Sequence, residues 1–87
     1  MATRESVTSL IEQCENALQF ANDQLQEGRI QEHDNTVNYT EALQSLENAY
    51  NDLTKLTLSA NSEQREQLHR MRQQLQQLQN EMIINPH

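Results

Sequence analysis

Residues 62–82 read SEQREQLHRMRQQLQQLQNEM, and this stretch decides the fold class. Apolar residues recur in it at alternating spacings of three and four positions. They are Leu68, Met71, Leu75, Leu78 and Met82. Such spacing is the a and d pattern of a heptad repeat, so it predicts an α-helix with one narrow apolar face. The many glutamines between these positions also occur in segments of low complexity, but the intact heptad register favours an ordered helix.

Polar residues mark the ends of this helix. Asn61 and Gln64 have the spacing of a capping box, in which each side chain bonds to the backbone N–H of the other residue. Glu63 would lie in the first turn, where a negative charge interacts favourably with the helix dipole. Pro86 prevents continuation of the helix near the end of the chain. The sequence therefore predicts a helix over residues 62–83.

The preceding segment has a wider apolar face. Its a and d positions are Tyr39, Ala42, Leu46, Ala49, Leu53 and Leu56, and its adjoining e positions include Leu43 and Tyr50. A face of this width is typical of a helix packed into a globular core. Asn38 and Glu41 resemble a second capping box, and the polar break at residues 59–62 ends the pattern. We expect this helix over residues 36–58.

The first segment repeats the same a, d and e pattern. The a and d positions are Val7, Leu10, Cys14, Ala17 and Ala21, and the e positions are Ile11, Leu18 and Leu25. Thr3 and Ser6 are candidate N-terminal caps. Gly28 suits the left-handed residue that often ends a helix, but a connection over residues 28–37 would exceed the ~2–8 residues usual in bundles. We expect a helix over residues 4–30. Either this helix extends past Gly28 to about Glu32, which we favour, or the loop over residues 28–37 has a role of its own.

Composition agrees with a purely helical protein. The chain has 87 residues, which is the size of one domain. Gly and Pro occur once each, and this scarcity argues against the frequent turns of a β-sandwich. Short connections force neighbouring helices to be antiparallel. The sequence thus predicts an all-α fold, an antiparallel three-helix bundle that forms one domain over residues 1–87.

Charge and hydropathy exclude several classes of partner. Thirteen acidic against six basic residues give a net charge of −7, which repels nucleic-acid phosphates and anionic membrane surfaces. The chain does not begin with a basic segment followed by an apolar run, and its longest apolar run is Met82-Ile83-Ile84. Cys14 is the single cysteine, so an intrachain disulfide is excluded. We expect a cytoplasmic protein that binds neither nucleic acid nor membrane.

Three stretches resemble a known family. They are residues 1–4 (MATR), residues 31–33 (QEH) and residues 61–79 (NSEQREQLHRMRQQLQQLQ). On these residues the chain resembles the YtzC-like proteins, a small family of unknown function from Bacillus and its relatives. The resemblance covers essentially the whole chain, and its specific part is the last of the three stretches. It implies a bacterial, cytosolic protein, and it supplies no catalytic residues because none are established for the family.

Few residues in the chain could carry chemistry. His33 lies in a Gln-Glu-His-Asp cluster at residues 31–34 that lacks the ligand number and spacing of a metal site, and we interpret the cluster as a solvated loop. Cys14 occupies an apolar position, which favours a buried, unreactive thiol. A single glycine leaves no phosphate-binding loop. The sequence predicts no catalytic, cofactor-binding or metal-binding residues, and therefore neither an enzyme nor a cofactor.

Two features suggest interaction or signalling. Arg65 and Arg72 share the e position of the last predicted helix, and Arg70 lies nearby. One interpretation is that their aliphatic stems cover the edges of a thin apolar seam. The other is that Arg65, Arg70 and Arg72 form a basic strip that docks an acidic partner. His69 would point away from the seam, as in histidine-phosphotransfer domains, although the motif and the fourth helix of those domains are missing.

These observations leave three functions open. The leading hypothesis is a non-catalytic protein-interaction or regulatory module with an unknown protein partner. A second is signalling with phosphorus chemistry, either phosphotransfer through His69 or an aspartyl-phosphate phosphatase of the sporulation type, whose Ser-Gln-Glu-Leu-Asp motif the chain lacks. The third is a structural homodimer in which the last helix pairs with a second copy through its heptad seam.

Overall fold

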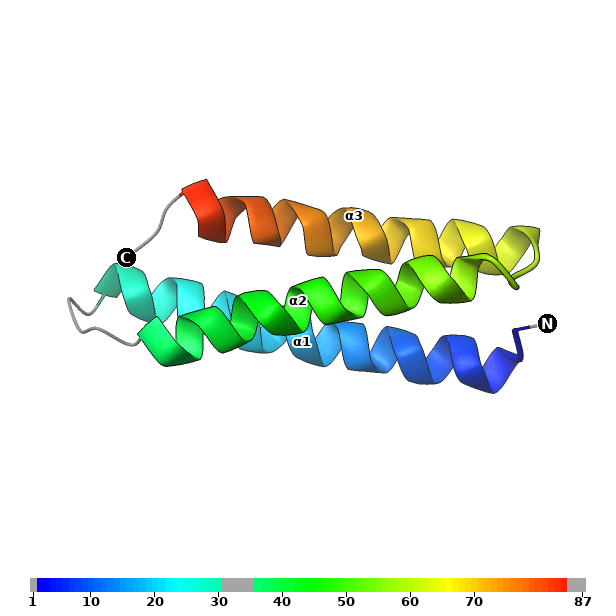
Figure 1. Ribbon diagram of the computed structural model, residues 1–87, viewed down its shortest axis with the longest axis horizontal. Coiled ribbons are helices and arrows are strands. Elements are labelled where there is room, and N and C mark those ends of the chain that lie inside the picture. Colours follow the sequence, from blue (N-terminus) through cyan, green and yellow to red (C-terminus); the bar gives the residue numbers. More distant parts are fainter. Residues whose placement is uncertain (1, 31–35, 85–87) are drawn as a thin grey trace.

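Three helices make up the computed structural model, which describes residues 2–30 and 36–84. They are α1 (Arg4–Ile30), α2 (Thr36–Thr57) and α3 (Ser62–Ile84). The helices run alternately up and down, and each contacts both of the others (Figure 1). No strand occurs among the described residues. The predicted all-α fold, an antiparallel three-helix bundle, is confirmed.

Side-chain caps begin two of the helices as the sequence predicts. Before α1, the Thr3 hydroxyl oxygen accepts a hydrogen bond from the backbone N–H of Ser6 at 3.0 Å. Before α3, the Asn61 side-chain oxygen accepts from the Gln64 N–H at 2.9 Å. The Gln64 side-chain oxygen accepts in turn from the Asn61 N–H at 3.0 Å. These bonds satisfy backbone donors that the first turn of a helix leaves without partners.

The predicted bounds of α1, residues 4–30, are confirmed, whereas two local boundary signals, at Gly28 and Asn38, are wrong. Gly28 does not end α1 as a left-handed residue, because the helix continues through it to Ile30. A glycine inside a helix costs only about 1 kcal/mol relative to alanine, which continued backbone hydrogen bonding offsets. Asn38 does not cap α2, because that helix already begins at Thr36. The rest of the predicted connection, residues 31–35, lies outside the described residues.

A tight turn joins α2 to α3 and holds the start of the chain. α2 ends at Thr57 and α3 reaches Ile84, each within one residue of the predicted end. The Ala60 N–H donates to the Thr57 carbonyl at 3.3 Å, and Ala60 is buried although the periodic pattern gave it no role. The Ser59 carbonyl accepts a hydrogen bond from the Ala2 N–H at 2.9 Å. The N-terminal end of α1 is therefore fastened to the α2–α3 turn.

The core runs along the bundle axis between the three helices. Its buried apolar residues are Val7, Cys14, Ala21, Leu25, Ala42, Leu46, Ala49, Leu53, Ala60, Leu68, Met71, Leu75 and Met82. All of these except Ala60 occupy predicted a, d or e positions. The other predicted positions, such as Leu10 and Leu78, are half-buried and pack against this cluster. The predicted apolar faces are therefore the faces that meet in the core.

Candidate functional site

The three arginines that the sequence singles out all lie on α3, and two of them contact α2. The Arg65 Nε donates a hydrogen bond to the Thr57 backbone carbonyl at 3.3 Å. One heptad further along α3, a guanidinium nitrogen of Arg72 donates to the Tyr50 hydroxyl at 2.9 Å. Thr57 and Tyr50 are likewise one heptad apart on α2. Because the two helices are antiparallel, their e positions lie opposite one another at successive heptads along the α2–α3 edge.

Arg72 is the most deeply placed of the three arginines. Its side chain is half-buried, and the guanidinium carbon lies 4.9 Å from the centre of the Tyr50 ring. A cation over an aromatic face is attracted by the ring quadrupole. The Arg72 Nε is buried and has no hydrogen-bond acceptor among the described residues. These contacts make Arg72 part of the packing between α2 and α3.

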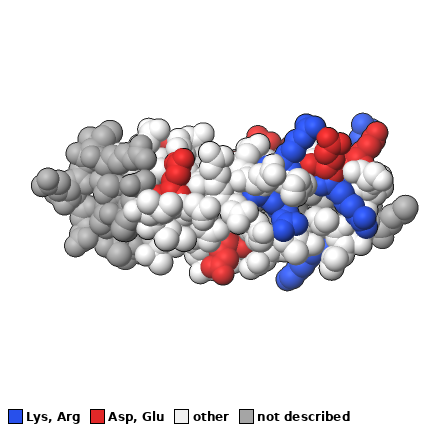
Figure 2. Space-filling model, turned by 90° about the horizontal axis from the view of Figure 1, so that it is seen from above, with Lys and Arg blue, Asp and Glu red and all other residues white. Residues whose placement is uncertain are grey.

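Arg70 is exposed on α3. A guanidinium nitrogen of Arg70 lies 2.7 Å from a carboxylate oxygen of Glu66 and forms an ion pair with it. Both side chains are mostly exposed, Arg70 by 72% and Glu66 by 67%. Basic side chains gather toward the end of the molecule that contains the α2–α3 turn, with acidic side chains among them (Figure 2). Intramolecular partners at all three arginines favour the structural interpretation. A partner-binding role for Arg65, Arg70 and Arg72 stays a prediction.

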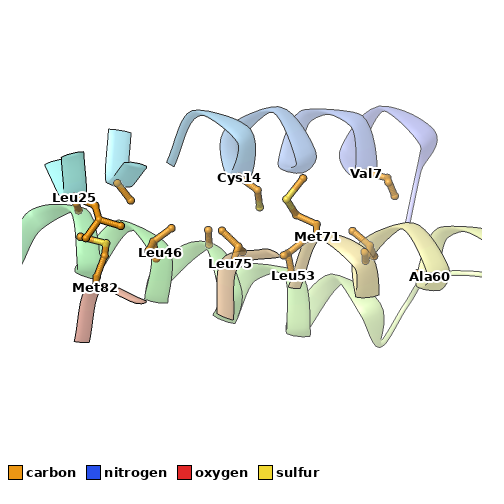
Figure 3. Close-up of a cluster of buried hydrophobic side chains, with 13 residues drawn as sticks. Val7, Cys14, Leu25, Leu46, Leu53, Ala60, Met71, Leu75 and Met82 are labelled. Atoms are coloured by element: carbon orange, nitrogen blue, oxygen red, sulfur yellow. The ribbon is translucent and has the colours of Figure 1, made fainter. Parts of the chain in front are cut away.

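Cys14 lies inside the core, where Figure 3 places it between Met71 and Leu75 along the bundle axis. Its side chain is fully buried. Burial, with smaller contributions from the charges of Asp52 and Glu15, raises the pKa of the thiol from 9.0 to about 11. A protonated thiol that solvent cannot reach is a poor nucleophile and a poor metal ligand. The geometry agrees with the predicted role of a small apolar core residue.

The histidines do not meet at a common site in the described chain. His69 is exposed on α3, and His33 with its acidic neighbours lies outside the described residues. Within residues 2–30 and 36–84, no group of three or more His, Cys, Asp or Glu side chains is arranged to hold a metal ion. None of the three helices there combines the length and hydropathy that crossing a bilayer requires.

A groove that sequence reasoning missed runs between α1 and α2. Its first part, with a volume of about 390 Å³, is lined by Ser6, Ser9, Leu10, Gln13, Asp52, Lys55, Leu56 and Ser59. Its second part, of about 360 Å³, is lined by Gln13, Asn16, Ala17, Phe20, Ser45, Asn48, Ala49 and Asp52. The two parts share Gln13 and Asp52, so they form one continuous groove. No residue of α3 contributes to the lining.

The heptad pattern explains why this groove is open. In α1 and α2 the e positions hold large side chains that face α3, as Leu18 does beside Leu78 and Tyr50 does beside Arg72. The opposite flank of each seam, at the g and c positions, holds mainly small or polar residues such as Ser45. α3 therefore packs against the e side and leaves the other side uncovered. The difference between the large e-position side chains and the small or polar g- and c-position side chains is the sequence feature from which the groove could have been predicted.

The groove has an apolar floor and a mostly uncharged rim. Leu10 and Leu56 are half-buried there, and Phe20 keeps 36% of its surface exposed. Amide and hydroxyl groups dominate the rim, and Asp52 and Lys55 are its charged members. Few charges are typical of the centre of protein–protein interfaces. An open groove of this kind suits a helical protein surface better than a small molecule, which needs an enclosed, mostly apolar pocket.

The structure thus defines a small antiparallel three-helix bundle whose candidate site is a surface groove between two helices. The chain belongs to the family described as "Protein of unknown function (DUF2524)", which matches residues 1–84. The "Uncharacterized protein YtzC" of Bacillus subtilis (strain 168) is a relative, 52% identical over 51 residues. That match covers 59% of this chain and 57% of the relative, so it spans a little over half the length of each.

The resemblance to the YtzC-like family is therefore confirmed. No solved structure matches the chain. The family description and the name of the relative give no activity, so the comparisons place the chain among proteins of unknown function. Any more specific role has to be inferred from the geometry of the molecule.

Proposed function

We propose that the chain is a non-catalytic protein-interaction module of the bacterial cytoplasm and that it binds protein through the α1–α2 groove. The observation that carries the proposal is the groove itself, a continuous surface with an apolar floor and a mostly uncharged rim. In four-helix bundles a further helix packs across two neighbouring helices in this way. The groove therefore accepts a helical surface from a partner, whose apolar side chains would cover Phe20 and the floor.

The arginine side of α3 is the competing surface. Arg65 and Arg72 contact α2, and Arg70 is paired with Glu66. A partner that took over these guanidinium groups would have to replace contacts inside the molecule. The apolar side chains of the groove, such as Phe20, have no polar contacts to exchange, and burial of this apolar surface contributes roughly 25 cal/mol per Å². The groove is therefore the proposed docking surface, and Arg70 is the residue at which the alternative can be tested.

Matched variants distinguish the two surfaces. Phe20→Gln removes the exposed ring from the groove, and Arg70→Glu reverses an exposed charge on α3. Tagged wild-type chain and both variants are incubated with native lysate, and captured proteins are quantified by mass spectrometry. We expect Phe20→Gln to lose most of the specific partner and Arg70→Glu to retain it, with helicity unchanged in both by circular dichroism.

The reverse outcome would move the binding surface to α3. If Arg70→Glu lost the partner and Phe20→Gln kept it, the basic strip would be the docking site. If the wild-type chain captured no protein above an unrelated helical control of similar charge, the interaction module itself would be contradicted.

Phosphotransfer through His69 is the second candidate, and the exposure of this residue on α3 is the observation that favours it. A neighbouring carboxylate argues against it, because Glu66 lies one helical turn away and is paired with Arg70. A phosphoryl group at the imidazole would have to compete with Glu66 for the Arg70 guanidinium. Incubation with radiolabelled acetyl phosphate should leave the chain unlabelled. Label that His69→Ala abolishes would establish the phosphotransfer function instead.

A further inference from the structure

Charged residues on α2 lie at equal distances on either side of Asn48. Asn48 and Lys55 line the groove, and Glu41 lies one heptad beyond Asn48 along the same edge of the helix. Glu41 is seven residues before Asn48, and Lys55 is seven residues after it. The three share one heptad position, so they form a line along α2, and all three are exposed. Among the described residues, the ion pair that forms is between Arg70 and Glu66, and neither Glu41 nor Lys55 takes part in it.

We propose that the groove binds a second copy of this chain in antiparallel orientation, about a two-fold axis that passes beside Asn48. The inference rests on the proposed function, because it names the partner of the same groove. Such an axis places residues at equal distances before and after position 48 opposite one another on the two α2 helices. Lys55 of each copy then lies opposite Glu41 of the second copy, and the symmetry forms this pair twice.

The α1 side of the groove fits the same arrangement. Because α1 and α2 are antiparallel, the level of Asn48 corresponds to that of Ala17, which lines the same part of the groove. The axis therefore passes between Gln13 and Phe20 on α1. Phe20 of one copy comes opposite Gln13 of the second copy, at the part of the groove that contains Leu10. The exposed ring is then covered, as is common for aromatic side chains that contribute strongly to binding.

The charges select the antiparallel orientation. In a parallel arrangement, α1 of one copy would face α2 of the other, and Lys55 would come opposite Ser9 and Leu10, where the α1 lining contains no acid. The antiparallel arrangement joins opposite charges at both ends of the interface, although each copy has a net charge of −7. Charges at an interface rim chiefly fix orientation and partner choice. A second copy carries the complementary pattern by symmetry.

Lys55 is the single lysine of the chain, and this makes the arrangement directly testable. A carbodiimide joins an amine to a carboxylate without a spacer, so it links only groups in contact. Within one copy Lys55 and Glu41 are fourteen residues apart on one helix, a separation of roughly 21 Å. A Lys55–Glu41 cross-link can therefore form only between copies. We expect mass spectrometry to find this cross-linked peptide in the band of doubled mass.

Charge-swap variants supply the control. Lys55→Glu and Glu41→Lys each place like charges opposite one another, and we expect each to raise the dissociation constant of the dimer at least about tenfold in analytical ultracentrifugation. The double variant restores opposite charges in reversed order, so its dissociation constant should return to near that of the wild type. Both positions are exposed, so all three variants should keep wild-type helicity.

Two results would overturn the inference. A wild-type chain that stays monomeric at millimolar concentration would exclude self-association, while the Phe20→Gln lysate experiment would still decide whether the groove binds a different protein. A dimer that yields no Lys55–Glu41 link and ignores both charge reversals would exclude this arrangement, as expected if copies paired through the α3 seam instead.

Discussion

Cys14 occupies an a position at the middle of the core, and all of its surface is buried. In this setting the thiol acts as a small apolar side chain. Ionisation would place a negative charge among apolar neighbours and near the carboxylates of Asp52 and Glu15. Burial is the larger of these effects, and together they raise the pKa of the thiol to about 11. The residue is therefore protonated at neutral pH.

This raised pKa makes stability depend on pH in the alkaline range. The unfolded chain releases the thiol proton near pH 9.0, whereas the folded chain keeps it until about pH 11. The contribution to stability is complete below pH 9.0 and is lost as the pH rises through 11, because the unfolded state then binds fewer protons. We expect the free energy of unfolding, measured with urea, to fall by about 2–3 kcal/mol over this range.

Cys14→Ala is the control for that measurement. Every other group that ionises at alkaline pH is present in both proteins, so the difference between their pH profiles isolates the thiol. The wild type should lose more stability than the variant on going from neutral to strongly alkaline pH. Equal losses would show that the thiol ionises alike in the folded and unfolded states.

The sequence pattern predicts which residues are buried better than it predicts which polar side chains form hydrogen bonds with one another. Arg72 and Tyr50 both occupy e positions, but e positions on two helices become neighbours only when the bundle has a given handedness. The 2.9 Å hydrogen bond between the Arg72 guanidinium and the Tyr50 hydroxyl is therefore a property of the tertiary structure. Periodicity predicted the packing of the arginine stem, and it could not predict this bond.

Among the helices, α3 has the narrowest apolar face, and polar contacts help to hold both of its ends. Up to Met82 its apolar residues occupy a and d positions alone, whereas α1 and α2 add e positions. The Tyr39 hydroxyl on α2 donates to the Met82 carbonyl at 2.6 Å. At the other end the capping box of Asn61 and Gln64 satisfies the first turn. A helix with so little apolar surface should depend on its caps.

Asn61→Ala tests that dependence by removing the acceptor for the Gln64 N–H. We expect the free energy of unfolding to fall by about 1 kcal/mol, the usual cost of losing a polar N-cap. Asn61→Asp is the matched control, because it keeps an acceptor oxygen and adds a charge that favours the helix dipole. Thermal denaturation followed by circular dichroism measures both variants. Equal stability of the two would mean that the capping box contributes nothing.

Helix boundaries were predictable where a cap coincides with a break in the apolar pattern. Asn61 and Gln64 follow such a break, and α3 begins directly after Asn61. Asn38 and Glu41 have the same spacing, but they lie inside a helix that begins at Thr36. Polar residues three positions apart also share one face of a continuous helix. Local spacing alone cannot distinguish these two cases.

At the scale of the whole molecule, the three helices share one thin core. A chain of 87 residues buries roughly 60% or slightly more of its unfolded surface, so each large core side chain carries a substantial share of the stability. Matching apolar faces and short connections were sufficient to predict the antiparallel bundle. The groove was not predicted, because it depends on which flank of the α1–α2 pair the third helix covers.

Leu46→Ala and Leu75→Ala should each lower the free energy of unfolding by about 2–5 kcal/mol, the usual range for a buried leucine. Both side chains are fully buried, whereas Leu58 is 81% exposed. Leu58→Ala makes the same chemical change outside the core, so it should be nearly neutral. Urea denaturation of the three variants measures the contrast. Similar losses at all three positions would be incompatible with this core.

The position of Lys55 on the groove rim has a consequence for any chemistry that targets amines. Apart from the N-terminal amine, its side chain is the one primary amine in the chain. Dyes and sensor surfaces that couple through Lys55 would therefore lie at the edge of the groove and obstruct it. Thiol chemistry offers no other handle on the folded protein, because Cys14 is buried. A binding screen that immobilises the chain through Lys55 would thus block the proposed docking surface and return a false negative.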